Sequence, residues 1–329
     1  MTELVATTPG LYPLPDWAKR DLEDLKGHQK HDLISGDEGE EIIDVYQESR
    51  SQVIERQQEA NLDLVVEGQL RWDDMLVHPF AVHDAVDTRG IVRYYDNNNF
   101  YRETVVTDEL SFNGDIAAEL EEAEEQTDSL MAVLPGPYSL ADLATDEYYS
   151  DEQTFVNAVG EFLAEEANAF PEVEALFLPD PSLVTAPPED DVLSAVKEAL
   201  NTVSNAVDAP VLLHPYWEAF DEDTYTTVLD TDIDAVGFDL INAAEKNKRV
   251  ATEYGIPDSV VLGVVDGQNT RVESSAEINN RVDQFTSATS KPETAYITSN
   301  TGLFYLPMNR FGEKLDALGA ATEYTEVEA

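Results

Sequence analysis

The sequence predicts an α/β fold, and within that class a (β/α)8 TIM barrel with a β-hairpin inserted between strands 2 and 3. Eight short apolar runs recur along the 329 residues, and helical patterns separate them. The stretch 91–106, "IVRYYDNNNFYRETVV", breaks this rhythm and has the Tyr and Val content of two strands around Asn97, Asn98 and Asn99. No glycine-rich phosphate loop follows the first strand, which disfavours an open doubly wound sheet.

The strand candidates are mostly apolar runs, each bounded by turn residues. In chain order they cover 4–7, 62–68, 130–137, 174–181, 210–216, 234–240, 259–267 and 294–302. Helices are expected at 40–61, 139–149, 151–170, 189–207 and 310–322. Within 189–207, Val192, Val196, Leu200 and Val203 recur at helical spacing and form one apolar face. Strands that alternate with helices pair in parallel, so we expect one closed barrel and a single domain over 1–329.

The charge of the chain is extreme, because 68 acidic residues stand against 19 basic ones and give a formal net charge of −49. Such a surface repels nucleic acid and anionic membranes, since binding either requires Lys and Arg at phosphates. The acidic residues are spread along the whole chain, which indicates adaptation to high salt, where screening removes most self-repulsion. We therefore expect a halophilic protein without a nucleic-acid or membrane partner.

Cysteine is absent, so the chain has neither a disulfide framework nor a thiolate metal ligand. The N-terminal residues "MTELVATTPG" lack the basic and apolar regions of a signal peptide, and no apolar run is long enough to span a bilayer. These features predict a cytoplasmic protein.

In a barrel of this type the chemistry lies at the carboxyl ends of the strands. His214 and Asp239 end adjacent strand candidates and could be two zinc ligands or a hydrogen-bonded base pair. A catalytic zinc ion needs a third protein ligand, for which Glu218, Asp221 and Asp266 are equivalent candidates. The structural alternative is that His214 ends its strand and hydrogen-bonds a neighbouring loop. Residues alone leave both open.

Several stretches, in this order, resemble the cobalamin-independent methionine synthases, above all the short archaeal forms that carry only the catalytic barrel. They are "NLDLVVEGQLRWDDM", "LPGPYSL", "LFLPDPSL", "LLHPYW", "LGVVDGQNTRVESSAEI" and "TSNTGLFYLP". The resemblance covers nearly the whole chain and agrees with the barrel. It implies transfer of a methyl group from a methyl-folate or methyl-corrinoid donor to the thiol of homocysteine, which a zinc ion holds as thiolate.

The resemblance also implies where the family's four zinc ligands fall, and two of them are lost. The histidine is His214, and the glutamate is the shorter Asp239. The two cysteines fall on Tyr216 and Thr301. Because the soft donors are missing, we expect no bound zinc and no cofactor.

The family's homocysteine site is altered in the same way. Its serine near the N-terminus falls on Leu11, its glutamate after the second strand on Gln69, and its Asp-Glu pair on Pro179 and Asp180. The histidine of its Asp-x-His stretch becomes Gln268. By this resemblance the expected remnant catalytic residues are Asp266 and Arg271, and the expected substrate-pocket residues are Gln69, Asp180, Tyr216, Trp217 and Thr301.

Two hypotheses for function follow. The long bacterial members of the family carry a second barrel without the metal site, so this chain could be a partner or regulatory barrel for an intact methionine synthase paralogue. Alternatively, it could be an active methyltransferase with an altered acceptor or metal-independent chemistry, which keeps a folate or corrinoid methyl donor.

Overall fold

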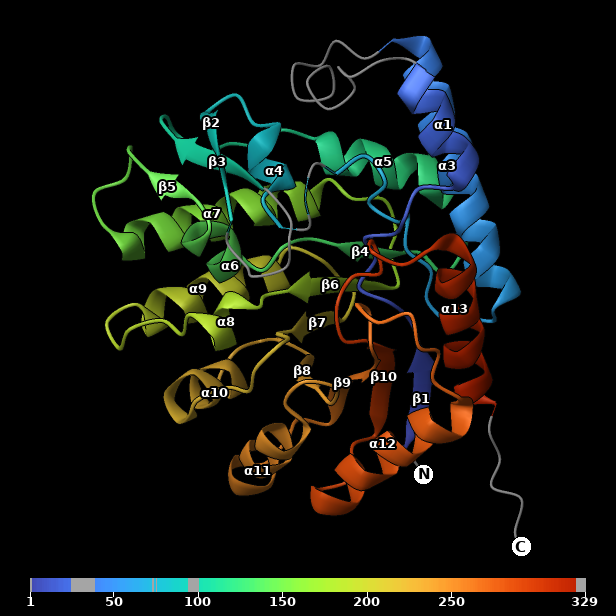
Figure 1. Cartoon of the computed structure of the whole chain (residues 1–329). Coiled ribbons are helices and arrows are strands. Elements are labelled where there is room, and N and C mark those ends of the chain that lie inside the picture. The colour runs from blue at the N-terminus through green and yellow to red at the C-terminus, as the bar shows by residue number, and fades with distance from the viewer. Residues whose placement is uncertain (1, 25–38, 73, 75, 94–100, 324–329) are drawn as a thin grey trace, which may run out of the picture.

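The computed structural model describes residues 2–24, 39–72, 74, 76–93 and 101–323. Its main sheet has seven parallel strands in the order β1-β10-β9-β8-β7-β6-β4, curled as Figure 1 shows. These strands are β1 (Glu3–Ala6), β4 (Met131–Val133), β6 (Ala175–Pro179), β7 (Val211–His214), β8 (Ala235–Asp239), β9 (Ser259–Val265) and β10 (Thr294–Ser299). All seven fall within the runs predicted as strands or start one residue before them.

The eighth predicted strand, 62–68, lies between the two edges of this sheet. On one side the amides of Asp63 and Leu64 donate to the carbonyl of Ala6 at the end of β1. On the other side Val65 exchanges hydrogen bonds with Ser129 and Met131 and forms a parallel bridge to Leu130. We call residues 62–67 the closing segment, because these bonds join β1 to β4. The predicted barrel fold is confirmed.

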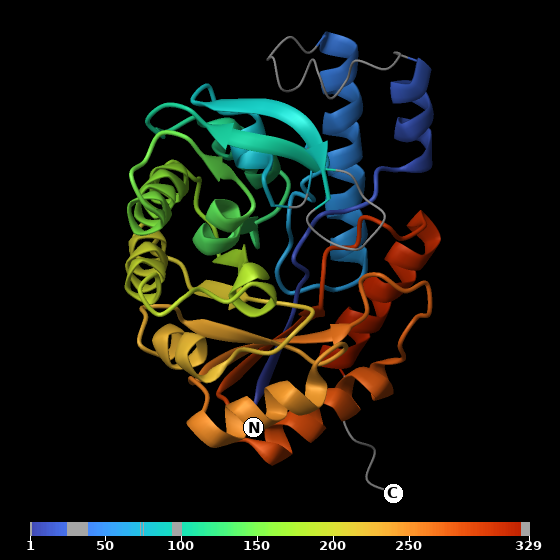
Figure 2. The same cartoon turned by 60° about the vertical axis from the view of Figure 1, so that its left-hand side comes forward.

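Long helices surround the barrel on its outer side (Figure 2). In chain order, the helices of the described residues are α1 (Asp16–Asp24), α3 (Glu40–Glu59), α4 (His78–Ala81), α5 (Asp115–Glu124), α6 (Pro137–Asp142), α7 (Glu152–Asn168), α8 (Ser182–Thr185), α9 (Leu193–Ser204), α10 (Glu222–Leu229), α11 (Ala244–Tyr254), α12 (Ser275–Ala288) and α13 (Met308–Thr322). The apolar face predicted for 189–207 is buried at Val196, Leu200 and Val203, where α9 packs on α7. Strands buried on both faces and helices with one apolar stripe are what this architecture requires.

The predicted hairpin insertion is present between the second and third barrel strands. Its strands are β2 (Val86–Val92) and β3 (Tyr101–Val106), which pair antiparallel, and β5 (Thr145–Asp146) adds a short third strand. The turn expected at 97–99 lies outside the described residues. The helix expected over 139–149 ends at Asp142, because Thr145 and Asp146 pair with β3 instead of continuing it.

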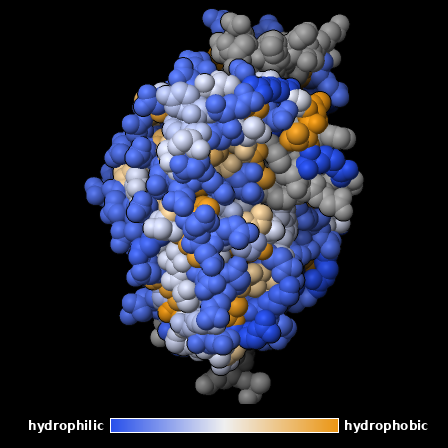
Figure 3. Space-filling view, turned by 90° about the vertical axis from the view of Figure 1, so that its left-hand side faces the viewer, coloured by the Kyte–Doolittle hydropathy of each residue, from blue (hydrophilic) through white to orange (hydrophobic). Residues whose placement is uncertain are grey.

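The surface is largely hydrophilic on the face shown in Figure 3, with apolar residues scattered singly. Within the described part of the chain, no helix is long and apolar enough to cross a membrane.

Candidate functional site

His214 and Asp239 are the last residues of β7 and β8, and Asp180 directly follows β6. Parallel pairing brings the ends of β6, β7 and β8 side by side, with Pro179 opposite His214 in the register. The amide of Asp180 donates to the carbonyl of His214 at 3.2 Å.

His214 is fully buried at the end of β7. Its Nε2 donates to the carbonyl oxygen of Asn300 at 3.0 Å, which leaves Nδ1 as the ring's remaining acceptor. Nδ1 lies beside Gly237 of β8, where a Cβ would overlap it, and has no hydrogen-bond partner. Burial lowers the pKa of His214 to about 4, and the nearby Asp239 only partly opposes this. His214 is therefore a neutral histidine that donates a hydrogen bond to a backbone carbonyl.

Asp239, fully buried at the end of β8, accepts five hydrogen bonds. Its Oδ1 accepts from the amides of Ile241 and Asn242, at 2.8 and 2.9 Å. Its Oδ2 accepts from the Trp217 amide, the Asn242 side chain and the Asn300 side chain, at 2.9, 2.9 and 3.1 Å. Two carboxylate oxygens have about four lone-pair sites, so this carboxylate is saturated by N–H donors. It holds three chain segments together.

Asn300 joins these two residues, and the sequence prediction treated it only as part of a strand end. Its side-chain amide donates to Asp239, its Oδ1 accepts from the Gly267 amide at 3.0 Å, and its carbonyl accepts from His214. The sequence places Asn300 at the end of a predicted strand. Because a polar side chain at a buried strand end must find hydrogen-bond partners, this position could have identified it. We call His214, Asp239 and Asn300 the Asn300 network.

The residues at the two cysteine positions are both buried. Tyr216 lies edge-on to Trp217, with ring centroids 4.7 Å apart, and Thr301 donates to the Gly302 carbonyl at 3.3 Å. Trp217 itself has a φ of +78°, a left-handed backbone that is strained for a bulky side chain. The bond from its amide to Asp239 fixes this conformation.

Gln69 follows the closing segment and belongs to a pair of strained turns. Gly10 and Leu11 have φ values of +73° and +51°, and Gly68 and Gln69 have +103° and +49°. The Leu11 amide donates to the Gln69 side-chain oxygen at 2.7 Å, and the Tyr12 amide donates to the Gly68 carbonyl at 2.9 Å. The Leu303 amide in turn donates to the Leu11 carbonyl at 3.0 Å. We call these the paired turns.

Asp180, after β6, is fully buried under the start of α6. Its Oδ1 accepts from the amide and the hydroxyl of Ser139, at 2.8 and 2.5 Å, and its Oδ2 is unpartnered. Burial raises the pKa of Asp180 to about 7. Ser139 of α6 thus bonds to the residue that follows the neighbouring strand β6.

Asp266 and Arg271 do not converge with these groups. The Asp266 carboxylate accepts from the Gln268 amide at 3.0 Å and stabilises its own turn. The Arg271 side chain is exposed and pairs with Glu277 of α12. The buried carboxylate of this loop is instead Glu273, which lies 2.8 Å from the buried ammonium group of Lys314 on α13.

A second buried charge cluster lies behind the closing segment, and the sequence reading missed it. Arg50 of α3 pairs with Glu119 and Glu122 of α5, and its Nε lies 4.0 Å from a Glu67 oxygen. Arg71 also pairs with Glu119. We call Arg50, Glu67, Arg71, Glu119 and Glu122 the Arg50 network. In the sequence, Arg50 lies three or four residues from Tyr46, Val53 and Ile54, on the apolar face of α3. An arginine on such a face indicates a buried ion pair.

The donor set at the strand ends does not fit a zinc ion. Asp239 has no lone pair left over, one His214 nitrogen is protonated and bonded, and the other two positions carry a phenol and a hydroxyl. Across the described residues, no group of three or more His, Cys, Asp or Glu side chains is placed to hold a metal ion.

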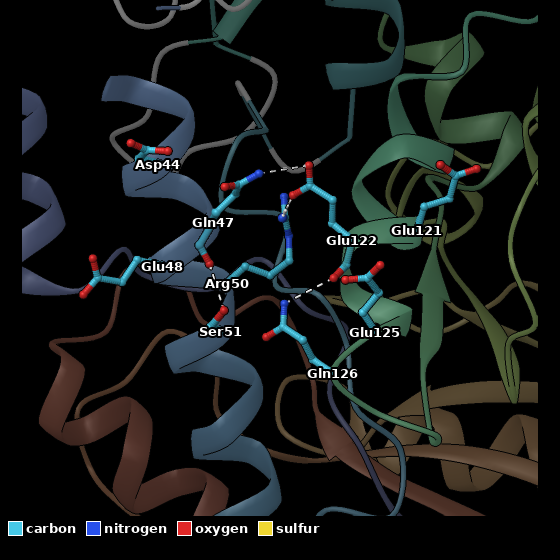
Figure 4. Close-up of a pocket in the computed structure, with 9 residues that line it drawn as sticks. All are labelled: Asp44, Gln47, Glu48, Arg50, Ser51, Glu121, Glu122, Glu125 and Gln126. Carbon is cyan, nitrogen blue, oxygen red and sulfur yellow. Dashed lines mark hydrogen bonds and ion pairs between the residues drawn. The ribbon is translucent and has the colours of Figure 1, made fainter. Parts of the chain in front are cut away.

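Four surface cavities of about 410–620 Å³ lie between outer elements, and none of the nine predicted site residues lines them. One of about 610 Å³ lies between α3 and α5, and Figure 4 shows Arg50 reaching across it toward Glu122. The remaining lining is mostly acidic, with Asp44, Glu48, Glu121 and Glu125 around the rim.

Comparison with known proteins agrees with this fold. The family model described as "Cobalamin-independent synthase, N-terminal domain" matches residues 83–290, more than half of the chain. Proteins named methionine synthase are similar over nearly the full length. The one from Saccharolobus solfataricus is 24% identical, with 99% of this chain and 96% of that protein covered. The one from Sulfolobus acidocaldarius is 23% identical, with 96% and 90% covered.

Two solved structures share the fold. A B12-independent methionine synthase from Shewanella sp. W3-18-1, in complex with selenomethionine, has a TM-score of 0.77 at 18% identity, with 97% of this chain and 96% of that chain covered. A putative vitamin-B12 independent methionine synthase from Listeria monocytogenes has a TM-score of 0.71 at 15% identity, with 98% of each chain covered. At these identities the likeness concerns the fold alone.

Proposed function

The chain belongs to the cobalamin-independent synthase N-terminal domain family, and from this premise we propose that it is a metal-free, methionine synthase-like barrel that assists an intact catalytic barrel. The observation that carries the proposal is the saturation of Asp239 by five N–H donors at the position of a zinc ligand. The network replaces a metal centre with a structural one. The match to the model of an N-terminal domain supports the same assignment.

The first test is metal content and activity of the chain alone. The protein, purified in molar KCl, is analysed for zinc by emission spectrometry and assayed for methyl transfer to homocysteine. We expect neither stoichiometric zinc nor turnover, and the same result for His214→Gln. Zinc that is present in the wild type and lost in His214→Gln would contradict the proposal.

The second test concerns the partner. A paralogue that retains the His-x-Cys, Glu and Cys ligands is assayed at fixed concentration while this chain is added. We expect its methyl-transfer rate to rise and to level off at one chain per enzyme. A second acidic protein of similar net charge is the control for a non-specific effect of charge. An unchanged rate would remove the partner role.

One observation favours the alternative, an active methyltransferase with altered chemistry. This chain covers 96% and 90% of the two archaeal relatives named methionine synthase, so those proteins have no room for a second barrel of this size. Under this alternative the chain alone turns over after treatment with a chelator, and the buried Asp180 is its first candidate acid. Turnover by the chelated protein with a thiol acceptor separates the two proposals.

The charge supports a further part of the proposal, a cytoplasmic protein adapted to high salt. At low ionic strength the net charge of −49 repels itself, and added salt screens this repulsion. We expect circular dichroism to show unfolding when KCl is lowered below molar concentration. Cooperative folding in dilute buffer would contradict the halophilic assignment.

A further inference from the structure

Two stretches without charged residues meet at the carboxyl end of the barrel. In a chain whose residues are 26% charged, residues 4–15 and 294–309 contain no Asp, Glu, Lys or Arg. They include β1 and β10, which pair in parallel, so the loops that follow both strands leave the barrel on the same side (Figure 1). The Leu303 amide donates to the Leu11 carbonyl at 3.0 Å and holds the two loops together. We call residues 7–15 and 300–309 the uncharged rim.

The uncharged rim exposes two aromatic side chains. Phe304 and Tyr305 are 47% and 36% exposed, and their rings meet edge-on with centroids 5.4 Å apart. Leu11 and Leu14 of the same rim are half-buried. Six large apolar side chains are exposed in the described part of the chain, and only Phe304 and Tyr305 are sequence neighbours. The centre of a protein interface is depleted in charged residues and enriched in aromatic ones, and the uncharged rim has both properties.

The charge of the surrounding surface decides which partner the uncharged rim accepts. Two copies of the chain, each with a formal net charge of −49, repel each other wherever their acidic surfaces meet. The rim itself contributes no carboxylate, so two rims meet without this repulsion. A partner with a basic surface would find its complementary acidic residues elsewhere on the chain. A two-fold axis places the same residues on both sides of a contact, and such a contact requires a surface that complements itself.

We infer that the uncharged rim is the contact surface of a homodimer, in which two copies meet across a two-fold axis with Phe304 and Tyr305 of each copy as the central anchors. In molar salt the Debye length is about 3 Å, so apolar contacts contribute more to such an association than ion pairs between exposed groups. The contact covers the part of the barrel mouth next to β1 and β10. This inference does not depend on the proposed function, because it concerns the association of the chain with itself.

Sedimentation velocity of the full chain in molar KCl tests the dimer over a range of micromolar concentrations. We expect a monomer–dimer equilibrium that tightens as KCl is raised further, since screening weakens the repulsion between two acidic copies. A dimer held by ion pairs would loosen instead, and that result would overturn the inference. A wild-type chain that stays monomeric at high micromolar concentration overturns it as well, and leaves the proposed partner role untouched.

Variants of the rim decide whether the aromatic side chains form the contact. Phe304→Ser removes an anchor from both copies and should raise the dissociation constant about tenfold or more. Phe304→Glu places like charges on both sides of the two-fold axis and should leave a monomer. Ile91→Ser is the matched control, because Ile91 on β2 is 75% exposed and lies outside the rim, so the dissociation constant should not change.

A dimer that survives Phe304→Glu, or that is weakened equally by Ile91→Ser and Phe304→Ser, contradicts the assignment of the contact to the rim. Circular dichroism in the same buffer checks that each variant is folded. If both Phe304 variants are unfolded, Tyr305→Ser replaces them, and an unchanged dissociation constant for that variant overturns the inference.

Discussion

At the ends of β7, β8 and β10 one carboxylate, Asp239, accepts five hydrogen bonds from neutral N–H groups, whereas behind the closing segment three carboxylates share two guanidiniums. The Asn300 network thus leaves no oxygen of Asp239 unsatisfied. The Arg50 network has one carboxylate more than it has guanidiniums, and the Glu122 carboxylate is nearly half exposed. Buried polar groups stabilise a fold when every member is paired, and a partly paired network responds to pH and to the loss of any member. Substitutions in the Asn300 network and in the Arg50 network should therefore change the unfolding free energy by different amounts.

The largest effect is expected from Arg50→Met, which removes the cation shared by three carboxylates. Removing one partner of a buried ion pair leaves an uncompensated charge and costs about 3–5 kcal/mol of unfolding free energy. Urea unfolding in molar KCl measures it. The matched control is Arg310→Met, whose exposed pair with Glu313 should contribute about 0.5 kcal/mol or less. Equal losses for the two variants would mean that the Arg50 network does not stabilise the fold.

Asp239→Asn should cost somewhat less, about 2–4 kcal/mol, because the new side-chain NH2 group replaces an acceptor oxygen and can only donate, so it leaves neighbouring N–H groups without an acceptor. The same denaturation experiment measures the change. Asp266→Asn, which disturbs a single bond to the Gln268 amide, is the matched control and should lose about 1 kcal/mol or less. A small loss for Asp239→Asn would show that the five bonds are not tightly coupled.

The third prediction uses pH on the Asn300 network. The pKa of His214 is lowered to about 4 in the folded protein, so the unfolded chain binds its proton first as pH falls. This group contributes stability that is fully present above about pH 6.5 and is lost between pH 6.5 and 4, by about 2–3 kcal/mol. Unfolding free energies of wild type and His214→Gln, compared at each pH, isolate it. A difference between the two proteins that does not change with pH would refute the assignment of His214 as a neutral donor.

The smallest effect is expected from Gly237→Ala, which tests the close packing of His214 on β8. The added Cβ would overlap Nδ1 and lie 2.8 Å from the His214 Cα, so the strand must shift at a cost of about 1–3 kcal/mol. Gly39→Ala is the control, because nothing lies within 4 Å of the added Cβ there. Thermal unfolding compares the two. If Gly237→Ala is as stable as Gly39→Ala, His214 has room to move.

The barrel itself was readable from the sequence because strands buried on both faces are continuous apolar runs. Runs such as "PVLLH" and "DAVGFDL" therefore predict β7 and β8 from the sequence alone. The boundary at Asp142 was not readable, because the pairing of β5 with β3 joins residues about forty positions apart. Local propensity contains no information about such a partner.

The site divides in the same way. The sequence by itself determined which residues reach the strand ends, because a strand's carboxyl end is fixed by where its apolar run stops: His214, Asp239, Asp180 and Thr301 all lie there. Only the tertiary structure decided what they do. Whether Asp239 is a ligand or a saturated structural acceptor depends on amides of Trp217, Asn242 and Asn300, which come from different turns. Likewise, Glu67 and Arg50 lie on separate elements, the closing segment and α3. Their electrostatic interaction exists only when these elements pack together, because it depends on distance and burial and not on order along the chain.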